Sequence, residues 1–299
     1  MQTVFSQLSI LYIFLFVGWL IGRLKKDKAE HSDLLSVLLV NAFLPCKIFQ
    51  TFARNITVKS LSEKFYFPLA GLTLVLITIA VGLFASKLLT KNKYERKVYL
   101  YSFTIANYAY LGYVLVGAVF GDAFLSDFML FAVPFNFYTY TVGYILLTGG
   151  KFSWRKLVNP ITVAILLGIT VGLTGIKLPE VVLGVTSAAA ACVGPLSMIL
   201  TGMILSTFTF RELLSGKTAY IFTFIRLVGI PALAYLVCQI AHLDTLLPMI
   251  LIVTCMPCGL NTVVFPKLVG EDCKPGARLA LITHVLSLAT LPLWLSLIV

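Results

Sequence analysis

Long apolar stretches, separated by short charged connections, constrain the fold of this chain more than any other feature of its sequence. Each stretch has close to the about 20 residues that a helix needs to cross the hydrocarbon core of a bilayer. We therefore expect an all-α, polytopic membrane protein with ten transmembrane helices. The predicted spans are 4–24, 32–53, 65–87, 97–120, 127–148, 159–176, 183–207, 218–239, 245–266 and 277–298.

The composition agrees with a membrane protein. Only 12% of the residues are charged and 59% are hydrophobic, whereas a soluble domain carries about 25% charged residues. A net charge of +11 would suit nucleic-acid binding in a soluble protein. Here the basic residues lie in short loops, as they do on the cytoplasmic side of membrane proteins. We expect the lipid bilayer as a partner, no nucleic acid, and a multi-pass location in the cell (plasma) membrane.

The Lys and Arg residues also predict the orientation of the spans. With the amino terminus outside, four basic residues fall on the outer side, namely Arg54, Lys59, Lys64 and Lys177. The inner loops then hold seventeen, namely Arg23, Lys25, Lys26, Lys28, Lys87, Lys91, Lys93, Arg96, Lys97, Lys151, Arg155, Lys156, Arg211, Lys217, Lys267, Lys274 and Arg278. Because cytoplasmic loops are enriched in Lys and Arg, this bias predicts that both termini lie outside. The first 22 residues contain no Lys or Arg, so the opening stretch lacks the basic start of a signal peptide.

The two halves of the chain, 1–148 and 149–299, carry matching glycines and prolines. Three residues recur 150 positions later, so that Gly18, Gly22 and Pro45 correspond to Gly168, Gly172 and Pro195. Each half has five predicted spans, an odd number, so the second half must run in the opposite orientation. The sequence therefore predicts two inverted five-helix repeats, a plan that is common among secondary transporters.

One span in each half contains residues that interrupt a helix. These residues are Asn107 and Gly112 in the fourth span, and Pro257, Gly259, Asn261, Thr262 and Pro266 in the ninth. Proline removes a backbone donor and clashes with the preceding turn. Freed backbone groups are tolerated within a membrane only where protein or a water-lined cavity satisfies them. A pair of interrupted spans in corresponding positions is therefore the best sequence indication of a transporter's substrate site.

An ordered set of small-residue and proline motifs resembles the auxin efflux carrier family, in the form of its bacterial permeases. The motifs are Phe43-Leu44-Pro45, Asn107 with Leu111-Gly112, Asn159-Pro160, Gly194-Pro195-Leu196, Met256-Pro257 with Asn261, Gly270-x-Asp272 and Thr290-Leu291-Pro292. The chain departs from the family pattern at Val114, where a proline is usual. Asn107 and Gly112 would therefore have to break the fourth span by themselves.

The resemblance implies a fold and a substrate class. Spans one, two, six and seven would form a scaffold, and spans three to five and eight to ten a transport domain. The broken spans four and nine would cross at the midplane. The implied substrate is a small organic anion, such as auxin in plants or malate and malonate in bacterial relatives, and the implied assembly is a homodimer.

The candidate substrate-binding residues lie mostly at the breaks. They are Asn107, Tyr108, Gly112, Pro257, Gly259, Asn261, Thr262, Asn41, Arg226 and Asn136. All twelve Asp and Glu residues fall in predicted loops or at span ends, whereas cation and proton transporters usually hold an acid within the membrane. Amides, hydroxyls and the N-termini of helices can bind a carboxylate, so these residues favour an anionic substrate.

Several of these residues also have structural interpretations. Asn41 could bond backbone groups freed by Pro45, and Pro45 and Pro195 are interpreted as helix kinks. Arg226 could extend toward the cytoplasm. His284 could take part in proton transfer or simply pack one helix on another.

Signatures of enzymes, metals and cofactors are missing from the sequence. It has no His-x-x-x-His pair for zinc, no P-loop and no Gly-x-Ser-x-Gly, and Cys255-x-x-Cys258 lacks a thioredoxin-like context. We expect a secondary transporter of small organic anions that works by alternating access, without a cofactor. Its driving force could be the membrane potential or the ionisation of the substrate itself. The alternatives are a sodium-coupled symporter of the bile-acid carrier type and an anion sensor that does not transport.

Overall fold

The computed structural model describes residues 2–24, 28–151 and 158–298. Four of the basic residues used to predict the orientation, at positions 25, 26, 155 and 156, lie outside these ranges. Within them the regular structure is helical, apart from one isolated β-bridge. The α-helices are α1 Gln2–Leu24, α2 Lys28–Leu38, α3 Leu44–Asn55, α4 Val58–Lys64, α5 Tyr66–Leu89, α6 Lys93–Thr104, α7 Tyr113–Phe131, α8 Val133–Tyr138, α9 Tyr144–Thr148, α10 Pro160–Thr174, α11 Glu180–Ser206, α12 Phe210–Leu213, α13 Lys217–Phe224, α14 Ile230–Ile240, α15 Leu247–Cys255, α16 Asn261–Lys267 and α17 Lys274–Leu295. Four π-helical turns, η1 Leu39–Phe43, η2 Tyr108–Gly112, η3 Thr139–Gly143 and η5 Ile225–Gly229, each run into the α-helix that follows.

Seven of the described helical stretches are long and apolar enough to cross a membrane, which makes this a multi-pass membrane protein. They are Gln2–Leu24, Ser32–Asn55, Val58–Leu89, Tyr108–Phe131, Glu180–Ser206, Lys217–Ile240 and Lys274–Leu295. The expected ten membrane helices and the outward orientation of both termini stay predictions. Helices α6, α15 and α16 are short because backbone breaks divide the predicted fourth and ninth spans.

The boundary between the predicted fourth and fifth spans coincides with a glycine in α7. Gly121 has φ 84° and ψ 171°, which interrupts the helix there. The positive φ is a conformation that glycine adopts without a steric penalty. The chain therefore changes direction at this point, and α7 consists of two helical segments on either side of Gly121.

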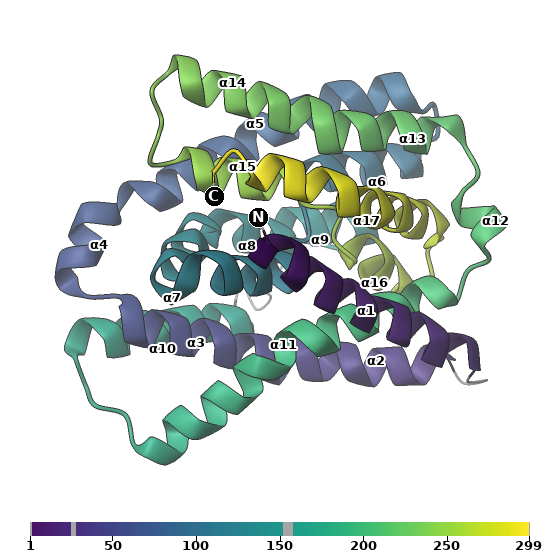
Figure 1. Ribbon diagram of the computed structural model, residues 1–299. Helices are drawn as coiled ribbons and strands as arrows, with labels where there is room; N and C mark the ends of the chain where they lie inside the picture. The colour runs from purple at the N-terminus through teal and green to yellow at the C-terminus, as the bar shows by residue number, and fades with distance from the viewer. Residues whose placement is uncertain (1, 25–27, 152–157, 299) are drawn as a thin grey trace.

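The helices form two groups with the broken helices between them. In Figure 1, α2, α3, α10 and α11 lie together in the lower part of the bundle, and α5, α13 and α14 lie in the upper part. Helix α1 packs on α11, and α3 packs on both α10 and α11. The interrupted segments α6–α7 and α15–α16 lie toward the middle, so that side chains at their breaks are shielded from solvent.

The Gly-x-x-x-Gly pair of α1 lets this helix approach α11 closely. A Cβ atom on Gly18 would collide with the backbone of Ile199, and one on Gly22 would collide with the side chain of Ser206. Small residues at such positions allow helix backbones to pack in direct contact within membranes.

The corresponding glycine pair of α10, Gly168 and Gly172, makes equivalent contacts with α3. A Cβ atom on Gly168 would collide with Phe49 of α3, and one on Gly172 with Ile56 at the end of α3. Phe49 and Ile56 precede Ile199 and Ser206 by the same 150 residues that separate the glycine pairs. The opening helix of each half therefore packs on the second helix of the other half, in the same register.

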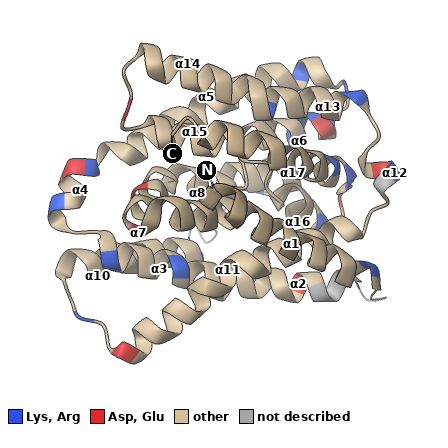
Figure 2. Ribbon diagram, viewed as in Figure 1, with Lys and Arg blue, Asp and Glu red and all other residues tan. Residues whose placement is uncertain are grey.

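Charged residues gather at the two ends of the bundle, and its middle is almost free of them (Figure 2). This distribution suits a protein whose helical middle lies in hydrocarbon, where an ionised side chain is costly.

Candidate functional site: the crossing of two interrupted helices

The first break separates α6 from η2. Helix α6 ends at Thr104, and Ile105 is extended with φ −110° and ψ 119°. Asn107 then caps the next helix, because its Oδ1 accepts from the backbone N–H of Leu111 at 3.4 Å. Gly112, expected to help break this span, has helical angles of φ −63° and ψ −51°. The amide of Asn107 is thus the side chain that restarts the helix.

The second break lies between α15 and α16, at residues 256–260. Met256 leaves the helix with φ −66° and ψ 146°. The following backbone is held by side chains, since Cys258 N–H donates to Thr283 Oγ1 at 3.1 Å. Thr262 Oγ1 donates to the carbonyl of Gly259 at 3.1 Å. Pro266 lies inside α16, so the break is shorter than the sequence predicted.

The two breaks meet. Ala106 and Cys258 form an antiparallel β-bridge, and Asn107 N–H donates to the carbonyl of Pro257 at 2.8 Å. Backbone groups that leave a helix in the membrane need partners, and here each broken segment supplies partners to the other. This pairing holds the two breaks together at a crossing, as the family resemblance implied.

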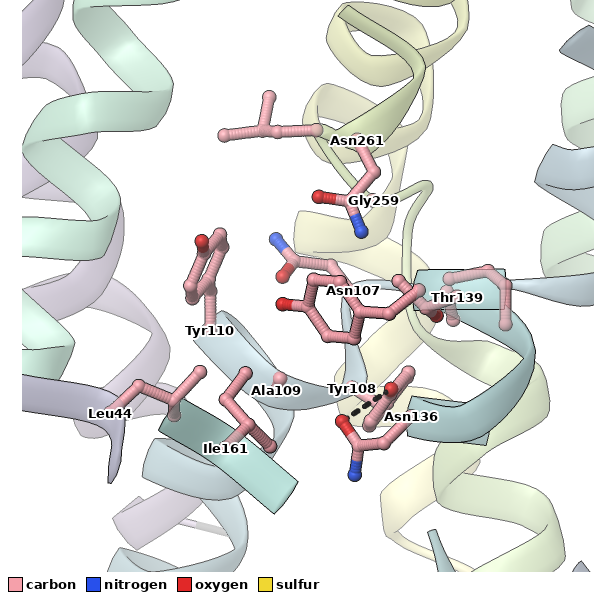
Figure 3. A pocket seen from close by; sticks show the side chains of 14 residues that line it. Leu44, Asn107, Tyr108, Ala109, Tyr110, Asn136, Thr139, Ile161, Gly259 and Asn261 are labelled. Carbon is pink, nitrogen blue, oxygen red and sulfur yellow. Dashed lines mark hydrogen bonds between the residues drawn. The ribbon is translucent and has the colours of Figure 1, made fainter. Parts of the chain in front are cut away.

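A small cavity of about 30 Å³ lies at the crossing (Figure 3). Its walls come from both breaks, from α8 and η3, and from α3 and α10 of the lower group. The lining residues are Leu44, Ile105, Ala106, Asn107, Tyr108, Ala109, Tyr110, Asn136, Thr139, Tyr140, Ile161, Gly259, Leu260 and Asn261. This volume has room for about two waters, so the cavity must widen before an organic ligand can enter.

Uncharged hydrogen-bonding groups line the cavity. Tyr108 donates to Asn136 Oδ1 at 3.0 Å, the bond drawn in Figure 3. Asn261 Nδ2 donates to Tyr101 Oη at 3.0 Å. The side chain of Thr139 adds a buried hydroxyl to the wall, beside the phenols of Tyr101 and Tyr108.

Five of the predicted binding residues line this cavity, namely Asn107, Tyr108, Asn136, Gly259 and Asn261. Three others, Gly112, Pro257 and Thr262, lie in the two interrupted segments but are not among the described lining residues. Asn41 also lies outside the lining, and its amide donates to the carbonyl of Val37 at 2.9 Å within its own helix. Pro45 is the second residue of α3, which follows η1 directly, and Pro195 lies inside α11. The interpretation of both prolines as helix kinks stays a prediction.

Arg226 lies behind α15 rather than in the cavity wall. Its side chain is 1% exposed, and its guanidinium donates to the carbonyl of Val253 at 3.3 Å. Val253 is in the last turn of α15, where unsatisfied carbonyls give the helix end a partial negative charge. The arginine therefore stabilises the end of a broken helix, and its Nε has no partner among the described residues.

Sequence reasoning missed several wall residues. Thr139 and Tyr140 lie on η3, one turn after Asn136, and a polar run in the fifth predicted span could have indicated them. Nothing in the sequence indicates that Leu44 and Ile161 line a cavity, because an apolar side chain in a span does not reveal which neighbour it faces. In the ranges that the structure covers, no group of three or more His, Cys, Asp or Glu side chains is arranged to hold a metal ion.

Two interrupted helical segments that cross over a buried polar cavity are typical of secondary membrane transporters. A family model described as "Membrane transport protein" matches the chain twice, over residues 3–153 and 145–295. The chain therefore belongs to this family, the auxin efflux carriers, and contains two of its repeats. It is also similar to an uncharacterized transporter of Methanocaldococcus jannaschii, with 26% identity over 302 residues that cover 95% of this chain and 96% of that protein.

Proposed function

We propose that this protein is a secondary transporter of small organic anions, mono- or dicarboxylates, which it binds at the crossing and moves by alternating access. The observation that carries the proposal is the cavity at the crossing, walled by amide, phenol and hydroxyl groups and by no charged side chain of the described residues. Neutral donors can bind a carboxylate, whereas a cation site would be expected to hold an acid. The helix that begins at Tyr108 adds the positive end of its dipole.

The packing supports a division into two bodies that move against each other. The scaffold would contain α1, α2, α3, α10 and α11, which pack on one another. The transport body would contain α5 to α9 and α13 to α17, and it carries both breaks. Leu44 and Ile161 belong to the first group and face residues of the second across the cavity. A cavity between two such bodies can open when one slides past the other.

The proposal includes ten membrane helices in two inverted repeats, with both termini outside and the protein in the plasma membrane. The reciprocal packing of the two Gly-x-x-x-Gly pairs supports the repeat, because the same contacts recur at matching positions of the two halves. Inverted repeats of this kind allow the scaffold and the transport body each to take helices from both halves.

Charge movement across proteoliposomes on a solid-supported membrane tests the proposal. Malate, malonate and an indole acid would be applied with and without Na⁺ to the wild type and to Asn107→Ala. We expect a sustained current for at least one anion that is independent of Na⁺ and at least about tenfold weaker in Asn107→Ala, because the variant loses a buried donor. Asn55→Ala is the matched control, since among the described residues the Asn55 amide bonds to Thr51 of its own helix.

Other outcomes identify the alternatives. Currents that require Na⁺ would indicate the symporter. Anion binding without current, measured by calorimetry on the same protein, would contradict transport and indicate a sensor. Equal currents from Asn107→Ala and Asn55→Ala would contradict the location of the site.

A further inference from the structure

His284 of α17 lies directly behind the crossing and contacts the amide that lines the cavity. Its side chain is 1% exposed. The ring nitrogen Nδ1 is 2.7 Å from the carbonyl oxygen of Ala280. The other ring nitrogen, Nε2, is 3.1 Å from Nδ2 of Asn107. The imidazole therefore bridges α17 and the first break.

The chemistry of the partners fixes where the ring carries its hydrogen. A carbonyl oxygen only accepts, so Nδ1 must carry the hydrogen that faces Ala280. A neutral ring then has a lone pair on Nε2, and this lone pair accepts from the Asn107 NH₂ group. The opposite tautomer would place a lone pair against the carbonyl and an N–H against the NH₂ group.

The amide of Asn107 is held at both ends. Its Oδ1 accepts from Leu111 N–H at 3.4 Å, so turning the amide over would place its NH₂ group against that N–H. In the observed orientation Nδ2 gives one hydrogen to His284. The second hydrogen of Nδ2 makes no hydrogen bond to a described residue, and Asn107 lines the cavity.

We infer that His284 is a positioning residue, which uses its Nε2 lone pair to hold the Asn107 amide so that a free N–H is available to a carboxylate in the cavity. This inference rests on the proposed function. His284 itself does not line the cavity. It acts through Asn107, and the anion is recognised by the amide hydrogen that the ring leaves free.

The surroundings of the ring supply no acid that would favour its charged form. Among the described residues, the elements packed against α17 carry Tyr12 of α1, Tyr99 and Tyr101 of α6, Cys192 of α11, Arg226 of η5, and Cys255 and Cys258 beside the second break. Their acids are Glu95 in the first turn of α6, Glu180 in the first turn of α11 and Glu212 of α12, and His284 makes no hydrogen bond to any of them. Tyr12 contacts His284, and it does so at the backbone carbonyl, at 2.9 Å. The acid Glu212 of α12 pairs with Lys274 at the start of α17, far along the helix from the ring.

A spectroscopic test reads the ring directly. The chain has three histidines, so a His31→Gln/His242→Asn variant labelled with ¹⁵N-histidine gives the signal of His284 alone. Asn suits position 242, because the backbone there has φ 52° and Asn adopts positive φ more readily than most residues. At neutral pH we expect the neutral ring with its hydrogen on Nδ1. A ring with its hydrogen on Nε2, or with both nitrogens protonated, would overturn the inference.

A double-mutant cycle tests whether the ring acts through Asn107. His284→Leu should raise the anion concentration for half-maximal current about tenfold in the wild type, and less than about twofold in the Asn107→Ala background. His284→Gln keeps an acceptor and should recover most of the loss. Equal effects in both backgrounds would overturn the inference, because a merely structural role does not depend on Asn107.

The two experiments separate this inference from the proposed function. The ring spectrum is recorded with no anion present, so it decides the orientation of the amide whether or not the wild type carries a current. A wild type that moves no anion counts against the proposed function alone.

Discussion

At the scale of single residues, the site combines neutral donors in the cavity with one cation behind it. Arg226 is the one Lys, Arg, Asp or Glu side chain that is buried among those the structure describes. Charges interact over long distances where water is excluded, so Arg226 can balance an anion that it does not touch. It was predicted to contact the substrate directly, but its position behind α15 suggests an electrostatic role.

Replacing this arginine should weaken the binding of every transported anion to a similar extent. We expect Arg226→Met to raise the concentration for half-maximal current by about five- to tenfold, with little dependence on the shape of the anion. Arg226→Lys, the matched control, keeps the charge and should lie near the wild type. The measurement is a concentration series for a monocarboxylate and a dicarboxylate on each variant. If Met and Lys weakened transport equally, the effect would come from packing and the electrostatic interpretation would be wrong.

Sequence reasoning located the polar groups of the crossing better than its apolar walls. Asn107 and Pro257 disturb a helix through their own chemistry, so the positions of the breaks could be predicted from them alone. The contact between His284 and Asn107 joins residues 177 positions apart, and local patterns carry no information about such a pair. Leu44 and Ile161 could not be assigned to the cavity for the same reason.

At the scale of helices, the glycine pairs predicted only a repeat, and the structure shows that they also form close helix contacts. Spacing of four residues places two glycines on one face of a helix, yet nothing in the spacing indicates which helix packs there. The structure pairs α1 with α11 and α10 with α3, so each contact joins the two halves of the chain. This exchange packs the two repeats directly against each other.

Bulky side chains in these contacts should destabilise the fold. Gly18→Leu and Gly168→Leu would each force a helix away from a neighbouring backbone, at a cost of about 1–3 kcal/mol. Thermal unfolding in detergent should show a lower midpoint for both. Gly184→Leu is the control, because nothing lies within 4 Å of a Cβ atom at that position of α11. A midpoint in either variant no lower than that of the control would contradict the close packing.

At the scale of the whole molecule, an ion pair between Lys267 and Asp33 joins the two proposed bodies. Lys267 of α16 is 2.6 Å from Asp33 of α2. Both residues line a cavity of about 430 Å³ between α2, α11 and α16, together with Cys273. The two side chains are 41% and 61% exposed, so the pair itself contributes little stability. The position of the pair makes it a test of movement, because a sliding transport body must separate these two residues.

Linking this pair should therefore stop transport. In a variant without the six native cysteines, Asp33→Cys/Lys267→Cys would be joined by a short, reducible thiol linker. We expect the sustained anion current to fall at least about tenfold and to return on reduction, because one body can no longer move past the other. The control applies the same linker to Glu212→Cys/Lys274→Cys, whose parent residues form an ion pair between α12 and α17. Since α12 packs on α17, this link joins elements that move together and should leave most of the current. A current that persists with α2 and α16 linked would show that the anion crosses without relative movement of the two bodies.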